Sequence, residues 1–317
     1  MLAIDFGSNS IKVACSGKKL ELLRLEQKID FSRPELRSLL TELDEKFPKQ
    51  LTVRVTGGKS MILPNEFEGR RIERVNEIQA IAKGGLHLST LHEAIVVNLG
   101  SGTTVVHAKK LGGSLKFLHL GGLALGAESL QALGKLTLQS KNLKQLDELA
   151  SKGDWTKVDS LISEVTGIKI SDKLPLHRPA AHFAKLNQKG ARPKKQDLAA
   201  GLLNMFATTL ICYLLPHAQR MLCKRVVLTG GLTKLPVLME MMQSFEKETG
   251  LRFYMPENAE FTTVIGAVVG TMIIMIIGWT MIRRHTSLKC FGNHSFHLIR
   301  LITVLVFMNS AFLILVL

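Results

Sequence analysis

Three glycine turns, each placed after a strand-like segment, constrain most strongly what this chain can fold into. The apolar segments LAIDF, AIVVNL and RVVLT lead into turns at residues 7–10, 100–102 and 230–231. Segments with apolar residues at helical spacing also occur, and residues 33–47 are one example. Strands that end in glycine turns and feed helices are typical of an α/β protein. Two such groups, before and after about residue 90, predict two similar lobes.

Two further helices are expected from the apolar pattern. Residues 72–88 predict a helix that is closed by Gly84 and Gly85, because glycine favours helix ends. Residues 195–222 predict a long helix between the strands of the second group.

Composition excludes several classes of protein. Hydrophobic residues make up 46% and charged residues 21%, so the chain is not disordered as a whole. The four cysteines lack C-x-x-C spacing, which excludes a zinc ribbon and a secreted disulfide framework. The formal charge of +15 indicates an anionic partner, but Lys and Arg are dispersed and there are only two Tyr and two Trp, so we expect no nucleic acid binding. The N-terminus lacks a signal-peptide pattern, and we expect a cytoplasmic protein.

The last part of the chain differs from the rest, because residues 271–317 contain four Lys or Arg and no acidic residue. Within it, 301–317 is uncharged and has about the minimum length of a membrane span. A span at 262–282 would put the basic segment 283–300 on the cytoplasmic side and the body of the protein outside the cytoplasm, so we do not adopt it. Two interpretations stay open: a membrane association through 301–317, or a stretch produced by a shifted reading frame or gene-model error. We therefore predict an N-terminal lobe at 1–90, a C-terminal lobe at 91–270, and an apolar and basic tail.

The glycine turns are candidate phosphate cradles, since tight turns of small residues present backbone N–H groups to an anion. In the first turn, Asp5 is a candidate Mg²⁺ ligand, and Lys12 is placed to meet phosphate charge. The chain contains neither a Walker A loop nor a dinucleotide fingerprint that follows a strand and opens a helix. Each turn alone is weak evidence for a phosphate site, whereas the order and spacing of the three turns are more specific evidence.

That order resembles the actin-like ATPase superfamily, in which two lobes with a ribonuclease H-like fold close on ATP. More narrowly, the chain resembles the type II (fumble-like) pantothenate kinases. The most specific similarities lie in SKGDWTKVDSLISEVTG at 151–167 and PENAEFTTVIGAVVG at 256–270. The family's hairpins and its catalytic segment are similar to IDFGSNSIKVA, VTGGKS, NEIQAIAKG and VNLGSGTTV. The resemblance implies an α/β, two-lobed fold with an ATP cleft between the lobes, plus an atypical apolar tail.

The resemblance also implies a role for each matched residue. Glu77 would be the general base that accepts the proton of the pantothenate hydroxyl group, a task suited to a carboxylate. Asp5 would bind Mg²⁺. The positions implied for ATP and its phosphates are Asp5, Gly7, Ser8, Asn9, Lys12, Gly100, Ser101, Gly102, Gly122, Gly126, Thr229, Gly230 and Gly231. The positions implied for pantothenate are Ser101, Thr103, Thr104 and His119.

Two departures from the family pattern affect these roles. His119 stands where the family has the arginine that pairs with the pantothenate carboxylate, and a neutral imidazole cannot replace a bidentate guanidinium. Gly126-Ala127-Glu128 replaces a run of three glycines, and a carboxylate there would repel phosphate. Either Lys116 or His119 binds the substrate carboxylate instead, or activity is weakened.

Taken together, the resemblance implies ATP-dependent phosphorylation of pantothenate, the first step of coenzyme A biosynthesis, with ATP and Mg²⁺. It further implies a homodimer and feedback by coenzyme A or an acyl-CoA. Two other function classes stay open. One is an actin-like pseudoenzyme that binds nucleotide, and the other is an exopolyphosphatase-like phosphohydrolase, which the D-x-G-S-N-S turn suits.

Overall fold

The computed structural model describes residues 1–17, 19–26, 29–167 and 175–269. All described residues belong to one compact unit. The predicted tail at 271–317, including the candidate anchor at 301–317, lies outside the described residues.

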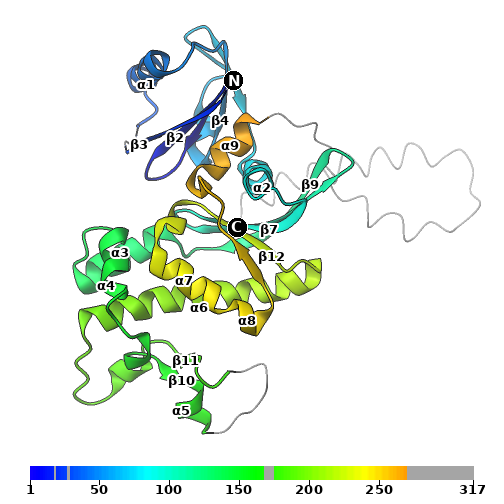
Figure 1. The fold of residues 1–317 in the computed structure, drawn as a ribbon. Helices are drawn as coiled ribbons and strands as arrows, with labels where there is room; N and C mark the ends of the chain where they lie inside the picture. Colours follow the sequence, from blue (N-terminus) through cyan, green and yellow to red (C-terminus); the bar gives the residue numbers. More distant parts are fainter. Residues whose placement is uncertain (18, 27–28, 168–174, 270–317) are drawn as a thin grey trace, which may run out of the picture. The chain divides into compact units, whose positions relative to one another are not determined.

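Two mixed β-sheets organise the described chain (Figure 1). The first sheet has the order β3-β2-β1-β4-β6-β5 and the second has the order β13-β12-β7-β8-β9. The strands of the first sheet are β1 (Leu2–Phe6), β2 (Ile11–Ser16), β3 (Leu20–Leu25), β4 (Thr52–Thr56), β5 (Glu66–Phe67) and β6 (Arg70–Arg74). The strands of the second sheet are β7 (Glu93–Leu99), β8 (Thr103–Leu111), β9 (Ser114–Leu123), β12 (Arg225–Thr229) and β13 (Arg252–Tyr254).

The two sheets repeat one topology. In each, three consecutive antiparallel strands are extended by two parallel strands, so β3-β2-β1-β4-β6 corresponds to β9-β8-β7-β12-β13. A small third sheet pairs β10 (Ser160–Leu161) with β11 (Pro179–Ala181). This repetition confirms the prediction of an α/β protein built from two similar halves.

Helices cover both faces of each sheet. The α-helices are α1 (Arg33–Lys46), α2 (Glu77–Leu88), α3 (Ala127–Leu138), α4 (Leu143–Ala150), α5 (Ile162–Thr166), α6 (Lys195–Met221), α7 (Pro236–Ser244), α8 (Glu246–Thr249) and α9 (Thr262–Val268). The 3₁₀ helices are η1 (Gly58–Ile62), η2 (Trp155–Lys157), η3 (Ala184–Asn187), η4 (Gly231–Lys234) and η5 (Ala259–Phe261). On the first sheet α1 packs its leucines against one face, and α9 covers the other. On the second sheet α6 covers one face, and α2 covers the other.

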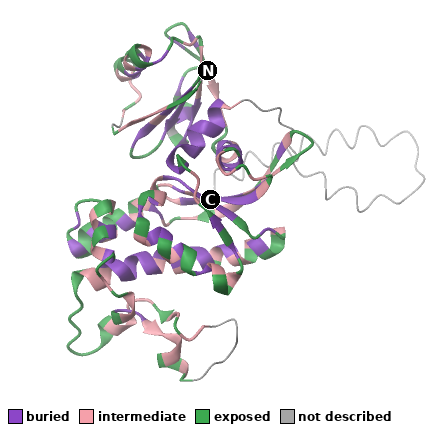
Figure 2. Cartoon of the chain, in the orientation of Figure 1, coloured by how far each residue is buried: buried purple, intermediate pink, exposed green. Residues whose placement is uncertain are grey.

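Helices α2 and α9 contact each other and so connect the two sheets (Figure 1). Helix α9 carries only small or apolar side chains and is buried throughout (Figure 2). The approach is close because glycines face the partner: a Cβ atom at Gly84 would overlap the Thr262 carbonyl, and one at Gly266 would overlap the Ala80 carbonyl. Helix α2 lies before residue 90 and α9 lies after it, so the two helices belong to different predicted lobes. The boundary between the lobes at residue 90 remains a prediction.

The prediction for residues 72–88 was wrong in two respects. The segment Arg70–Arg74 is strand β6, and the helix begins only at Glu77. Gly84 and Gly85 lie inside α2 and do not close it, because both are buried at contacts that leave no room for a side chain. Helix α6 confirms the long helix predicted at 195–222.

Among the described residues, only α6 has the length and apolar composition of a membrane span. Within its most apolar window, 61% of the residues are buried inside the protein. Burial of this kind is typical of a core helix, so α6 is weak support for membrane insertion.

Candidate active site

The first predicted turn connects β1 to β2 and carries Asp5 and Lys12 as a cross-strand pair. Asp5 is 5% exposed and lies on the sheet face that also carries Ala3, which packs against α9. Burial raises the pKa of the Asp5 carboxyl, and the Lys12 ammonium lowers it. The turn residues Gly7, Ser8 and Asn9 are exposed, so their backbone is accessible to a ligand.

Strand β4 completes the surroundings of Asp5. Thr56 is the last residue of β4 and pairs with Asp5 in the parallel register. The next residue, Gly57, has φ +92°, a conformation that favours glycine. A Cβ atom there would lie 2.8 Å from Asp5 Oδ1 and 2.7 Å from the Phe6 carbonyl oxygen. The β4 turn therefore passes close to the Asp5 carboxylate.

Glu77 is the first residue of α2, and its place is fixed by the helix start. The side chain of Asn76 caps the helix by accepting a hydrogen bond from the Gln79 amide at 3.1 Å. The Glu77 side chain keeps solvent contact, yet burial by surrounding atoms raises the pKa of its carboxyl. The nearby Asp5 raises this pKa further, whereas Lys12 lowers it. The structure thus brings Asp5, Lys12 and Glu77 into one electrostatic group.

The second turn, between β7 and β8, meets the first. The Ser8 hydroxyl lies 3.4 Å from the Ser101 hydroxyl oxygen, within hydrogen-bonding distance. Ser101 is exposed, while Gly100 and Gly102 are half-buried and hydrogen-bond to each other at 2.9 Å. The two serines face each other across the turns, so the two predicted phosphate hairpins are adjacent.

The start of α3 lies beneath the second turn. The amides of Ala127 and Glu128 donate to the carbonyls of Gly100 and Ser101, at 2.8 and 3.3 Å. A Cβ atom at Gly126 would lie 2.5 Å from the Ser101 carbonyl oxygen. These amides hold the turn itself, so the first N–H groups of α3 are already bonded. Glu128 is exposed in the first turn of α3.

Some predicted ligand residues have structural hydrogen bonds. The Thr103 side chain is buried and donates to the Leu125 carbonyl at 2.7 Å, whereas Thr104 on the opposite face of β8 is half-buried. The Thr229 hydroxyl is buried and donates to the Val97 carbonyl at 3.2 Å. Their direct contact with ligands remains a prediction.

The remaining predicted glycines lie in the third turn and at the end of β9. Gly230 has φ +89°, and a Cβ atom there would lie 2.5 Å from the Leu99 carbonyl oxygen, so this turn packs on the end of β7. Gly231 has no such neighbour. Gly122 pairs with Thr104, and a Cβ atom at Gly122 would overlap the Thr103 carbonyl.

The two candidates for the substrate carboxylate lie on opposite faces of β9. His119 pairs with Val106, whose side chain packs in the cluster around α2. Lys116 pairs with Lys109, one residue along from Ala108 of that cluster and therefore on the other face. Both are exposed, but only His119 shares the face of the sheet on which α2 lies.

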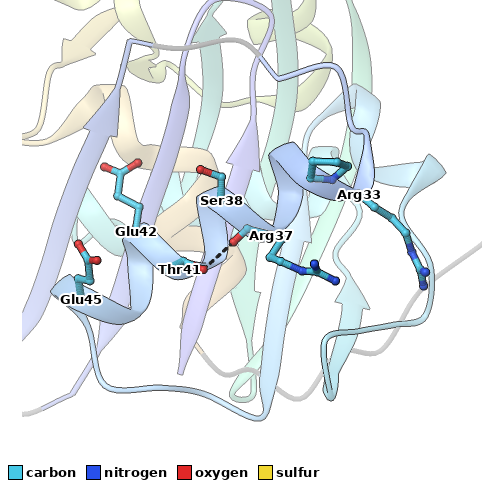
Figure 3. A pocket seen from close by; sticks show the side chains of 7 residues that line it. Arg33, Arg37, Ser38, Thr41, Glu42 and Glu45 are labelled. Carbon is cyan, nitrogen blue, oxygen red and sulfur yellow. Dashed lines mark hydrogen bonds between the residues drawn. The ribbon is translucent and has the colours of Figure 1, made fainter.

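A pocket elsewhere on the surface is unrelated to these residues. Figure 3 shows it on α1, where the Thr41 hydroxyl donates to the Arg37 carbonyl at 3.0 Å. The lining residues are Arg33, Pro34, Arg37, Ser38, Thr41, Glu42 and Glu45. None of the predicted site residues lines it, and its arginines lie toward one end of the helix and its glutamates toward the other.

Sequence reasoning gave no role to Thr56 and Gly57, although VTGGKS was recognised as a matching segment. The signal was a Thr-Gly-Gly turn that ends a strand, like the third turn at Thr229. Among the described residues, no three His, Cys, Asp or Glu side chains form a metal-binding cluster.

Comparison with known proteins gives consistent results. A family model described as Fumble matches residues 88–269. A type II pantothenate kinase of Oceanobacillus iheyensis is 25% identical over 281 residues, which cover 85% of this chain and 99% of that protein. A 4'-phosphopantetheine phosphatase of Mus musculus is 29% identical over 121 residues, or 37% of this chain and 14% of that protein.

A solved structure has the same fold. The activator of the 2-hydroxyisocaproyl-CoA dehydratase from Clostridium difficile, with bound ADPNP, superposes with a TM-score of 0.57 at 16% identity. The superposition covers 84% of this chain and 92% of the activator. The predicted actin-like ATPase fold is thereby confirmed.

Proposed function

Because the chain belongs to the Fumble family, we propose that it transfers the γ-phosphoryl group of ATP to the hydroxyl group of pantothenate. The observation that carries the proposal is the position of Glu77, at the start of α2 and in electrostatic contact with Asp5 and Lys12. A kinase of this kind needs a carboxylate base beside a cation and a phosphate cradle. The adjacent turns at Ser8 and Ser101 support the cradle.

In the proposed reaction Glu77 accepts the proton of the substrate hydroxyl as the phosphoryl group transfers. Its raised pKa makes it a stronger base than an ordinary glutamate. Lys12 offsets negative charge near the phosphates, and the exposed backbone of Gly7 and Ser8 donates to phosphate oxygens. Gly230 lets the third turn pack on the end of β7, and Gly231, which has no neighbour at its side-chain position, allows the nucleotide to approach the backbone there.

The residues present fit a magnesium ion. Asp5 supplies one carboxylate, the Gly57 backbone leaves space free of a side chain beside Asp5, and the hydroxyl of Thr56 lies buried without a partner among the described residues. Mg²⁺ is commonly held by one or two carboxylates together with phosphate and water, so a larger protein cluster is not needed. When bound, the ion neutralises phosphate charge.

We propose His119 as the residue that meets the pantothenate carboxylate, since it lies on the face of β9 shared with α2. Lys116 lies on the other face and is the weaker candidate. A single imidazole replaces a bidentate guanidinium, so we expect weak binding of pantothenate.

The family also supports proposals about the cellular setting: a homodimer, feedback by coenzyme A or an acyl-CoA, and a cytoplasmic location. Each is checked on the full chain, by light scattering, by inhibition of ADP release, and by cell fractionation. Sedimentation with membranes that resists high salt would favour the alternative of association through 301–317.

An ADP-release assay tests the proposed reaction with pantothenate, with polyphosphate, and without an acceptor. We expect pantothenate to accelerate ADP release and Glu77→Gln to lower the rate by about 100-fold or more, while ATP still binds. Glu21→Gln on the exposed edge of β3 is the matched control and should leave the rate unchanged. A wild-type rate in Glu77→Gln would refute the role of Glu77.

The same assay decides between the other function classes. The α3 amides that bond to the second turn, together with Glu128, favour a nucleotide-binding pseudoenzyme as the second candidate. ATP binding without pantothenate-dependent turnover would support it. Phosphate release from polyphosphate would instead support a phosphohydrolase.

A further inference from the structure

The hydroxyl group of Thr56 is an exception in the packing of the first sheet. Thr56 is fully buried, at 0% exposure, and its Oγ1 atom has no hydrogen-bond partner among the described residues. A buried polar atom without a partner destabilises the folded protein, because it has lost its hydrogen bonds to water. A valine would fill nearly the same space without this penalty, so packing alone does not explain the threonine.

The residues around Thr56 indicate a role for its hydroxyl group. Thr56 and Asp5 are paired residues on parallel strands, so their side chains lie side by side on one face of the first sheet. Lys12 pairs with Asp5 from the other side, and the Gly57 backbone lies against Asp5 Oδ1. The Asp5 carboxylate is therefore bordered by one cation, one backbone segment and one unused hydroxyl.

We propose that Thr56 is a positioning residue for the cation that Asp5 holds. Its hydroxyl donates a hydrogen bond to the Asp5 carboxylate when Mg²⁺ is bound, and this fixes the orientation of the carboxylate toward the ion. The proposed hydrogen bond gives the buried hydroxyl of Thr56 a partner beside the ion. The inference rests on the proposed function only in taking Asp5 as a Mg²⁺ ligand.

The alternative is that Thr56 is a packing residue with no role in binding, and a second threonine provides the matched control. Thr208 in α6 also has a buried Oγ1 atom without a partner among the residues the structure covers. It belongs to a helix on the second sheet, away from Asp5 in the fold. If burial is the whole explanation, Thr56→Val and Thr208→Val should behave alike.

The test uses the full chain and follows thermal unfolding in EDTA and in a titration of MgCl₂ at fixed ADP. We expect both valine variants to unfold at a higher temperature than the wild type in EDTA, because each loses an unsatisfied group. We expect only Thr56→Val to need about tenfold more Mg²⁺ for half-maximal stabilisation, the loss of one hydrogen bond to a charged group. Thr56→Ser keeps the hydroxyl and should respond to Mg²⁺ as the wild type does.

Three outcomes would overturn the inference. These are a wild-type Mg²⁺ response in Thr56→Val, an equal loss of response in Thr208→Val, and a wild-type chain whose unfolding does not change with Mg²⁺. Failure of the proposed function is distinguishable, because it appears as absent turnover of pantothenate while the Mg²⁺ response and its dependence on Thr56 persist.

Discussion

Replacement of Lys83 by methionine is expected to stabilise the protein. Lys83 lies in α2, is 9% exposed, and has no ion-pair partner in the part of the chain that the structure describes. Burial lowers the pKa of its ammonium group from the ordinary 10.5 to about 8, and the positive charge of Arg54 contributes to the same direction. Methionine has a similar length and no charge, so the packing of α2 is retained.

The size of the effect follows from the pKa. A fall from 10.5 to about 8, at about 1.36 kcal/mol per pH unit, sets an upper limit of about 3 kcal/mol. Because solvent still reaches the ammonium group, we expect about 1–2 kcal/mol at pH 7. The unfolded chain holds the proton up to its ordinary pKa, whereas the folded chain loses it near pH 8. The penalty is therefore complete below pH 8 and disappears as the pH rises toward 10.5.

Urea unfolding of the wild type and of Lys83→Met at several pH values measures this difference directly. We expect the variant to be more stable at pH 7 and the two curves to converge in alkaline solution. Lys135→Met in α3 is the control, because Lys135 is exposed, and its stability should match the wild type. A less stable Lys83→Met at pH 7, or a difference that does not change with pH, would refute the reasoning.

Two further predictions concern contacts between the sheets. Gly266→Ala should destabilise the fold by about 2 kcal/mol or more in urea unfolding, because a Cβ atom would overlap the Ala80 carbonyl, and equal stability would mean that α2 and α9 are not this close. Glu260, which is 9% exposed, pairs with Arg24 at 2.8 Å and with Lys234, and hydrogen bonds from both lower its pKa despite burial. Glu260→Gln should cost about 1–2 kcal/mol at pH 7. Its difference from the wild type should vanish in acid, since this stabilisation is lost as the pH falls below the ordinary glutamate range; a pH-independent difference would contradict the ion pair.

Several features of the site could be predicted because they are local in the chain. Asp5 and Lys12 come together across one short hairpin, and the hairpin pattern alone places them opposite each other. Alternation along β9 likewise separates Lys116 from His119, although the sequence analysis treated them as equivalent. A bulge follows His119, where Leu120 has no partner in β8 and the Tyr213 hydroxyl donates to its carbonyl at 3.0 Å. The local sequence did not predict the contact between Tyr213 and Leu120.

Other features depended on residues far apart in the chain. Gly84 and Gly85 were expected to end a helix, since glycine favours helix ends, but close approach to α9 and to Val96 keeps both inside α2. The unsatisfied hydroxyl of Thr56 is also invisible in sequence, because it depends on which polar groups the fold brings near and which it excludes.

The sequence by itself determined the order of strands and glycine turns, and from it the α/β class, the duplicated arrangement and the hairpin that carries Asp5. These follow from side-chain periodicity and turn chemistry, which act over a few residues. Only the tertiary structure decided that Glu77 lies near Asp5 and that the Ser8 and Ser101 turns meet. Helix α2 is held against α9 by the close contacts of Gly84 and Gly266, although α9 follows about 180 residues later in the chain. Such a contact depends on the packing of whole helices and sheets, and no local pattern specifies it.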